Sequence, residues 1–284
     1  MFYDTSHYRK SLEPVRDDRT HALVNILPRE SKRLISKGVL AMPEVKRVLE
    51  KGWFVVSRRI TPSYILEELT EQEFDTANCT AGIITEGRMA SVLEEDRLGP
   101  WVFRDGQLDE TPAPQALSEF TAYDVSIKGA NAVDPEGNIG VFAADKAGGT
   151  VGGIWPTLTA RGAHWVAPVS LERLIPSVIA AAKHCGNHLW DYTMGQSAGF
   201  MPVVNAQVIT EIQSLELLTG VTATHIGSGG VAGSEGAVML ALEGDRETVL
   251  EAFELVESIK GEPQFESPRL VPYVREPETS PAHR

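Results

Sequence analysis

The chain has 284 residues, a formal net charge of −13, 42% hydrophobic residues and 23% charged residues. The composition is that of a soluble globular protein, and the acidic balance argues against nucleic acid as a partner, because phosphate contacts need clustered Lys and Arg. No apolar run approaches the roughly 18 residues of a membrane span. With no signal-like N-terminus and two cysteines, we expect a cytoplasmic protein.

The first quarter of the chain begins with residues 1–25, which are polar and aperiodic, and we expect a loosely attached N-terminal arm there. Helical spacing of apolar residues then predicts two helices between Leu27 and Lys51, interrupted at Met42-Pro43. Residues 53–56 are predicted to form a short buried strand.

The loop over residues 57–63 carries Arg58, Arg59 and Thr61 and leads directly into a predicted helix. Two arginines and hydroxyl groups at a helix N-terminus indicate an anion site. The alternative is that Thr61 only caps the helix, with Pro62 at its first position and both arginines in solvent. The local pattern favours neither.

The most informative stretch covers residues 124–172. A short apolar run over residues 125–127 ends at Lys128, a glycine-rich loop and a helix predicted over residues 156–162 follow, and a second apolar run, 165–169, closes the unit. This is the form of a parallel α/β crossover, in which ligands bind beyond the carboxyl ends of the strands. Seven glycines between Lys128 and Gly153 favour backbone N–H groups that approach an anionic ligand, although a tight crossover would also use them.

The following segment offers four potential metal ligands close together, namely His184, Cys185, His188 and Asp191. A helix predicted over residues 171–183 is expected to end near Gly186, which spoils the i, i+4 geometry of the two histidines. A plain helix C-terminus is therefore favoured, and we predict no metal and no cofactor. The glycines at 227–236 also fail as a dinucleotide fingerprint, because they lead into a strand.

After Met201 the predicted elements have the order strand, helix, strand, strand, helix, strand. They cover residues 203–210, 211–218, 221–226, 237–242, 245–260 and 263–265. This βαββαβ order is that of a ferredoxin-like split unit. The segment 227–236, half of it glycine, is longer than the about two to five residues of a hairpin loop. Residues 267–284 are Pro-rich and polar and are predicted to be a flexible tail.

A family resemblance lies in the central stretch. Residues 128–135, KGANAVDP, resemble the D-G-A-D-E-V-D-P segment of ribose-5-phosphate isomerases, and residues 146–149, KAGG, are similar to the K-G-G-G loop of that family. Residues 129–168 also resemble the G-A-D…G-D-V-x-N-K-I-G-T segment of methylthioribose-1-phosphate isomerases. Both families belong to a superfamily with glucosamine-6-phosphate deaminases and CoA transferases. The resemblance implies a Rossmann-like sheet and, from the first family, an added ferredoxin-like unit.

The catalytic carboxylates of these isomerases are replaced in this chain. Such enzymes need a group that moves a proton between adjacent carbons. Where the first family has two Asp and a Glu, this chain has Lys128, Asn131 and Ala132, and no carboxylate stands between Gly148 and Gly162. An amide cannot accept that proton, so isomerisation of ribose 5-phosphate by the family mechanism is not expected.

The sequence therefore predicts an α/β protein with a Rossmann-like parallel sheet, helices on both of its faces, over residues 26–200, and a C-terminal ferredoxin-like α+β unit over 201–266. We expect an isomerase-like or transferase-like enzyme of this superfamily that acts on a small anionic metabolite, phosphorylated or carboxylated. The alternative is a non-catalytic or regulatory protein that only binds such a metabolite. We also expect a homo-oligomer.

The candidate residues follow from these patterns. The candidate catalytic residues are Lys128, Asn131, Glu172 and Glu235. The candidate ligand-binding residues are Arg58, Arg59, Thr61, Gly129, Asp134, Lys146, Gly148, Gly149, Thr150, Glu211 and Ser228. Lys128 and Lys146 would stabilise an oxyanion or a phosphate, and Asn131 would orient the substrate. A base would come from Glu172, Glu211 or Glu235.

Overall fold

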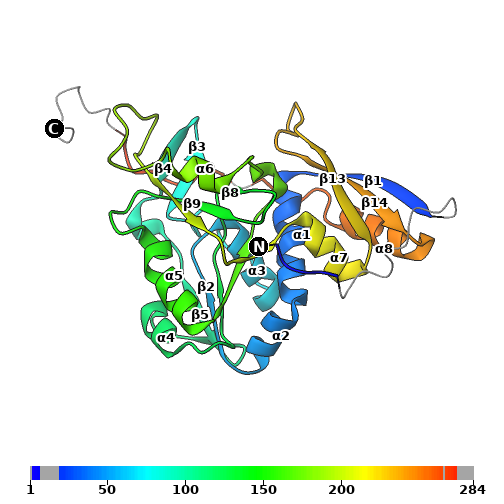
Figure 1. Ribbon diagram of the computed structural model, residues 1–284, viewed down its shortest axis with the longest axis horizontal. Coiled ribbons are helices and arrows are strands. Elements are labelled where there is room, and N and C mark those ends of the chain that lie inside the picture. Colours follow the sequence, from blue (N-terminus) through cyan, green and yellow to red (C-terminus); the bar gives the residue numbers. More distant parts are fainter. Residues whose placement is uncertain (1, 7–18, 265, 274–284) are drawn as a thin grey trace.

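The computed structural model describes residues 2–6, 19–264 and 266–273 (Figure 1). It is a mixed α/β protein built around a six-stranded sheet. In spatial order the strands are β12 (Gln207–Ile209), β10 (His164–Pro168), β7 (Val125–Ile127), β2 (Trp53–Val56), β5 (Trp101–Arg104) and β6 (Gln107–Asp109). The first four are parallel, and β5 and β6 continue the sheet in antiparallel pairing.

Helices cover both faces of this sheet (Figure 1). One face carries α1 (Pro28–Ala41), α2 (Pro43–Glu50) and α3 (Ile60–Thr70), and the other carries α4 (Ala113–Glu119) and α5 (Gly149–Arg161). In β2, Phe54 and Val56 pack toward the first set of helices, and Trp53 and Val55 toward the second. All four residues are buried, as in a central strand with two covered faces, so the prediction of a buried strand at 53–56 is confirmed.

A second, three-stranded antiparallel sheet has the order β1 (Thr20–Ile26), β14 (Val238–Gly244) and β13 (Thr222–Ser228). Helices α7 (Glu211–Thr219) and α8 (Arg246–Ser258) pack on it through a common core (Figure 1). Residues 20–25, expected in the N-terminal arm, thus form an outer strand together with Ile26, and the alternating Val24 and Ile26 are buried. Residues 7–18 of the expected arm, and 274–284 of the expected tail, lie outside the described residues.

The strands expected at the two ends of the βαββαβ series differ in the structure. Residues 203–210 supply β12, which joins the six-stranded sheet, and the end of β11 (Gly199–Val203). Pro263 and Gln264 form no strand, and Phe265 lies outside the described residues. The third strand of the small sheet comes instead from β1, far away in the chain.

The helix predicted over residues 171–183 is wrong. A short 3₁₀ turn, Leu171–Arg173, is followed by α6 (Val178–Ala182). Pro176 lies between them, and proline has no N–H to donate and disfavours helical backbone in the residue before it. Ser177 then caps α6 by accepting a hydrogen bond from the Ala180 N–H. The helix predicted from Pro156 begins earlier, at Gly149, as α5.

Two small sheets lie beside the carboxyl ends of the parallel strands. One contains β11, β9 (Ile139–Ala143) and β8 (Ala132–Val133), and the other is the hairpin of β3 (Gly82–Thr85) and β4 (Arg88–Ser91). Together they border the edge of the six-stranded sheet at which the loops after β2 and β7 emerge.

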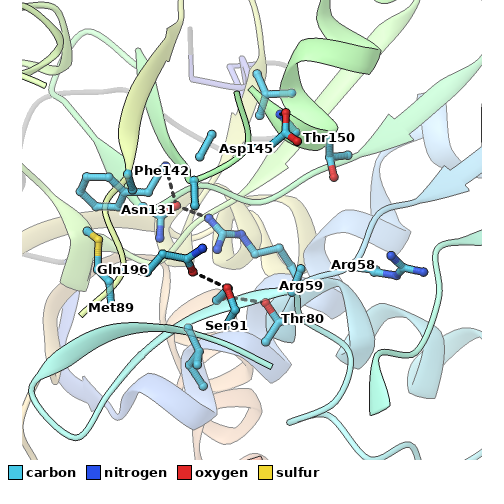
Figure 2. A pocket seen from close by; sticks show the side chains of 18 of the residues that line it. Arg58, Arg59, Thr80, Met89, Ser91, Asn131, Phe142, Asp145, Thr150 and Gln196 are labelled. Carbon is cyan, nitrogen blue, oxygen red and sulfur yellow. Dashed lines mark hydrogen bonds between the residues drawn. The ribbon is translucent and has the colours of Figure 1, made fainter. Parts of the chain in front are cut away.

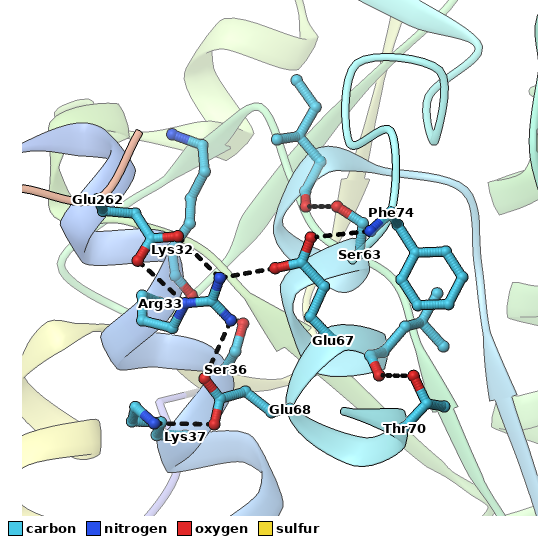
Figure 3. A network of polar contacts seen from close by, with 12 residues as sticks. Lys32, Arg33, Ser36, Lys37, Ser63, Glu67, Glu68, Thr70, Phe74 and Glu262 are labelled. Carbon is cyan, nitrogen blue, oxygen red and sulfur yellow. Dashed lines mark hydrogen bonds and ion pairs between the residues drawn. The ribbon is translucent and has the colours of Figure 1, made fainter. Parts of the chain in front are cut away.

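Helix α1 connects the two main sheets. Its Leu34 belongs to the core under the three-stranded sheet, and its Ile35 and Val39 belong to the core of the six-stranded sheet. Arg33 on the same helix forms ion pairs with Glu67 and Glu68 of α3 and with Glu262 beyond α8 (Figure 3). Among the helices of the described ranges, none combines the length and the apolar character of a membrane span.

Candidate functional site

The candidate site lies where β2 and β7 end. These strands are parallel neighbours, so the loops that follow them leave the sheet at the same edge. The loops are tied together, because the Ser57 N–H donates to the Ile127 carbonyl at 3.0 Å and Lys128 Nζ donates to the Arg58 carbonyl at 3.4 Å. Helix α3 begins at Ile60 with Arg59 as its N-cap residue, so Thr61 lies inside the first turn and is not the cap.

A pocket of about 380 Å³, here called the α5 pocket, opens at this edge (Figure 2). Its charged and amide lining comprises Arg58, Arg59, Arg97, Lys128, Asn131, Asp145 and Gln196. The first turn of α5, with Gly149 and Thr150, forms one wall, and the β3–β4 hairpin forms another. Lys128 and the two loop arginines are thereby brought together with the glycine-rich loop.

A larger pocket of about 780 Å³, here called the α1 pocket, lies beside the first. Its charged lining comprises Arg29, Lys32, Arg59, Glu172, Arg173 and Glu235. The two pockets share Arg59, Thr80, Gly82, Ile83, Ile84 and Asn131 as wall residues. Across both, seven Lys and Arg side chains face three carboxylates, so the cleft is cationic in a chain whose net charge is −13.

Lys128 is the most unusual of these cations. Lys128 is only 7% exposed, and it forms no ion pair with a carboxylate of any described residue. Burial lowers the pKa of Lys128 to about 7, and the nearby positive charges of Arg59 and Arg58 act in the same direction. Near neutral pH this amine can therefore both accept and donate a proton.

Arg59 and Asn131 form the boundary between the pockets. The Arg59 guanidinium points toward Asn131 and donates to its Oδ1, which also accepts the Phe142 N–H at 3.0 Å (Figure 2). The Nδ2 group of Asn131 makes no hydrogen bond to any described residue, so its N–H groups are available to a ligand. Burial, and then Arg173, lower the pKa of Arg59 to about 9, so its charge persists at neutral pH.

The glycine-rich loop is held in place by Asp145 and by one close contact. Asp145 Oδ1 accepts the N–H groups of Ala147 at 2.7 Å and Gly149 at 3.0 Å, and these bonds lower the pKa of Asp145. A Cβ on Gly152 would lie 1.9 Å from the Ala147 carbonyl oxygen, so only glycine lets α5 approach the loop this closely. Among the described residues that line the α5 pocket, the single carboxylate thus stabilises the loop.

The structure brings most of the candidate residues into the two pockets. The α5 pocket contains Arg58, Arg59, Lys128, Asn131, Gly148, Gly149 and Thr150, and the α1 pocket contains Thr61, Gly129, Glu172 and Glu235 together with the shared Arg59 and Asn131. Four candidates line neither pocket, namely Asp134, Lys146, Glu211 and Ser228.

Each of these four has another place in the fold. Asp134 accepts the N–H groups of Glu136, Asn138 and Val178 and fixes a turn. Lys146 is exposed, and Ser228 pairs with His225 across 2.8 Å. Glu211 is fully buried and accepts the Leu171 N–H at 3.0 Å, and burial raises its pKa.

Several pocket residues carry no local signal in the sequence. They are Arg29, Lys32, Thr80, Ser91, Arg97, Arg173 and Gln196. Each comes from a segment without a glycine-rich or strand-end pattern, and only tertiary packing brings them to the cleft. Within the described ranges no group of three or more His, Cys, Asp or Glu side chains could hold a metal ion.

In a comparison with known proteins, no family model, no curated protein and no solved structure matches the chain.

Proposed function

We propose that this protein is an enzyme that acts on a small anionic metabolite and binds the phosphate or carboxylate of that metabolite in the α5 pocket. The observation that carries this proposal is Lys128, a buried cation at the pocket without a carboxylate partner among the described residues. Burying an uncompensated charge is costly, and a bound anion would offset that cost. Arg58, Arg59 and Arg97 line the same pocket and would add to the attraction.

The N-terminus of α5 also supports an anion in the α5 pocket. Helix α5 has 13 residues, and its N-terminal turn lines the pocket, so its partial positive charge would favour an anion there. The Asn131 amide would donate to an oxygen of the substrate. These groups fit the expectation, drawn from the glycines of the central stretch, that an anionic ligand lies beside the glycine-rich loop.

The chemistry would be a proton transfer by Lys128. Its pKa of about 7 in the ligand-free protein lies close to physiological pH, so Lys128 would bind the anion as the ammonium and donate a proton to the reacting substrate. Lys128 stands where the isomerases have an Asp, so an amine would replace the missing carboxylate. We therefore favour an isomerase-like reaction, with a transferase-like reaction as the second form.

One observation favours the alternative of binding without catalysis. Asp145, the only carboxylate among the described lining residues of the α5 pocket, holds the loop through two backbone N–H groups, and these bonds lower its pKa and so weaken it as a base. If Lys128 moved no proton either, the pocket would only bind its ligand.

Calorimetry with ribose 5-phosphate tests the binding step. Lys128→Met should weaken binding by about 10- to 100-fold, because a charge-assisted hydrogen bond contributes about 1.5–3 kcal/mol. Lys37→Met, which removes a lysine paired with Glu68 outside both pockets, should leave the affinity unchanged. Equal affinities of wild type and Lys128→Met would contradict the proposal.

Catalysis is tested separately by incubating the protein with sugar phosphates in D₂O and following hydrogen exchange at carbon by NMR. An isomerase-like enzyme exchanges a carbon-bound hydrogen, and Lys128→Met should abolish the exchange. Tight binding without exchange or turnover would support the binding-only alternative.

A further inference from the structure

We infer that the metabolite carries two anionic groups, one bound in the α5 pocket and the other in the α1 pocket, with its uncharged part passing between Arg59 and the β3–β4 hairpin. This inference rests on the proposed function and adds the class of substrate, a doubly anionic compound such as a bisphosphate. It follows from the charge, the walls and the continuity of the α1 pocket.

The α1 pocket has more cations than it can pair internally. Lys32, only 8% exposed, donates to the Pro28 carbonyl at 2.8 Å and lies 3.9 Å from Glu172. Arg173 shares that carboxylate at 3.5 Å, and Arg29 forms no ion pair with any described residue. One carboxylate thus serves two buried or half-buried cations, and a third cation is left for a ligand.

The other carboxylate of this pocket, Glu235, reduces the positive excess but does not cancel it, because four cations and two carboxylates line the pocket. Glu235 accepts the Gly233 N–H at 2.9 Å within its own loop and makes no ion pair with the cations of the described residues. Arg59 adds a further positive charge at the boundary with the α5 pocket. The α1 pocket therefore has the charge of a second anion site.

The second glycine-rich segment builds the outer wall of this pocket. Gly233, Glu235 and Gly236 line it, reaching across from the loop between β13 and β14 of the three-stranded sheet. Gly236 has φ +80°, and a Cβ there would lie 2.9 Å from Glu172 Oε2 and 3.0 Å from Pro28. The positive φ favours glycine at this position, and a Cβ there would require the Glu172 side chain to move.

The two pockets are joined by a largely uncharged wall. Thr80, Gly82, Ile83 and Ile84 of the hairpin region line both, opposite Arg59 and Asn131. Pockets of about 380 and 780 Å³ hold more than a single phosphate. A molecule with a short uncharged backbone and an anionic group at each end matches this lining, because Arg59 is the one charged residue among those that the two pockets share.

Equilibrium dialysis with radiolabelled inorganic phosphate tests the two sites without assuming the shape of the metabolite. The wild type and Lys37→Met should bind two phosphate ions per chain. Lys128→Met should retain only the ion of the α1 pocket, and the double variant Arg29→Met, Arg173→Gln should retain only that of the α5 pocket. If the double variant does not fold, Arg29→Met alone takes its place. This single variant should bind phosphate at least tenfold more weakly at one of the two sites.

Two other outcomes of the dialysis each count against one of the two proposals, the doubly anionic ligand or the proposed function. A single phosphate in the wild type that is lost in Lys128→Met would overturn this inference and leave the proposed function standing. Two phosphates that both persist in Lys128→Met would overturn the proposed function.

Fructose 1,6-bisphosphate and fructose 6-phosphate test whether one molecule bridges the sites. The bisphosphate should bind at least tenfold more tightly than the monophosphate to the wild type, and Arg29→Met should remove most of that advantage. Equal affinities for the two sugars, with two phosphate sites present, would mean two separate sites and would overturn the single bridging ligand.

Discussion

At the scale of the residue, the site depends on a lysine that the fold holds in an unfavourable place. Lys128 follows directly after β7, where Gly129 and Ala130 leave no bulky side chain beside it, and its backbone N–H donates to the Val166 carbonyl at 3.1 Å. Its position is therefore set by the sheet and not by an ion pair. Such unfavourable burial is typical of a functional residue, because stability is exchanged for a perturbed pKa.

This burial predicts a pH-dependent stability for the ligand-free protein. The pKa of Lys128 is about 7 in the folded state, against an ordinary value of about 10.4 when unfolded. Below pH 7 both states are protonated and the destabilisation is complete. Between pH 7 and about 10.4 the unfolded state binds more protons, so stability rises with pH. Lys128→Met should thus be more stable than wild type at pH 6, with the difference shrinking toward pH 10.

Urea denaturation at pH 6, 8 and 10 measures this trend. The exposed Lys46→Met serves as the control for the loss of a lysine. A stability difference between wild type and Lys128→Met that stays constant across this range would show that the Lys128 amine titrates normally.

Anion binding should in turn raise the pKa of Lys128, because a nearby negative charge favours the protonated amine. At pH 8, sulfate binding should therefore take up protons from the buffer, and Lys128→Met should take up fewer. Calorimetry in two buffers of different ionisation enthalpy measures the uptake, and sulfate itself does not titrate in this range. Sulfate binding without proton uptake in the wild type would place the anion away from Lys128.

At the scale of the element, two adjacent glycines of α5 differ in the contacts that they make. Gly152 packs against the Ala147 carbonyl of the glycine-rich loop, whereas a Cβ on Gly153 would meet no atom within 4 Å. Both lie inside the helix. Of these two glycines, only Gly152 constrains the position of the loop at the pocket.

This contrast predicts opposite effects of the same substitution. Gly152→Ala should destabilise the protein by about 1–3 kcal/mol through overpacking and should weaken anion binding, because Asp145 and the loop must move. Gly153→Ala should stabilise it by about 0.5–1 kcal/mol, since alanine favours the helix. Urea denaturation and phosphate titration of both variants provide the measurement. Equal stabilities of the two variants would mean that the loop moves to accommodate the added methyl group without a loss of stability.

At the scale of the whole molecule, α1 holds the two main sheets in one structure, and the cleft lies beside that junction. Arg33 bonds to Glu67 at 2.6 Å, to Glu68 at 3.0 Å and to Glu262 at 2.7 Å (Figure 3). Burial opposes its charge, but the hydrogen bonds to Glu262 and Glu67 outweigh burial and raise the pKa of Arg33. The network joins α1, α3 and the segment after α8.

Arg33→Met should therefore destabilise the protein by about 1.5–3 kcal/mol, the range for hydrogen bonds to charged groups, because three carboxylates lose a shared cation. Arg88→Met is the control, since Arg88 pairs with Glu86 in a turn and an exposed pair contributes about 0–1 kcal/mol. Thermal unfolding of the two variants measures the difference. A similar small effect in both would show that apolar packing alone joins the sheets.

Local patterns in the sequence determined the elements of this protein that depend on neighbouring residues. The strands at 53–56 and 125–127 have the predicted bounds, and α8 lies inside the predicted helix at 245–260, because burial on both faces, helical periodicity and end signals are local properties. Placing Arg59 and Lys128 at one edge needed only the rule that parallel strands end together.

The tertiary structure alone decided the remainder. Pairing of β1 with β14 joins residues more than 200 positions apart, and no local period indicates such a partner. No local pattern in the sequence marks Lys32 as buried, yet the packing of α1 against the 3₁₀ turn buries it beside Glu172. The α1 pocket could not be predicted for that reason: its charges come from separate segments, and only long-range contacts place them on one wall.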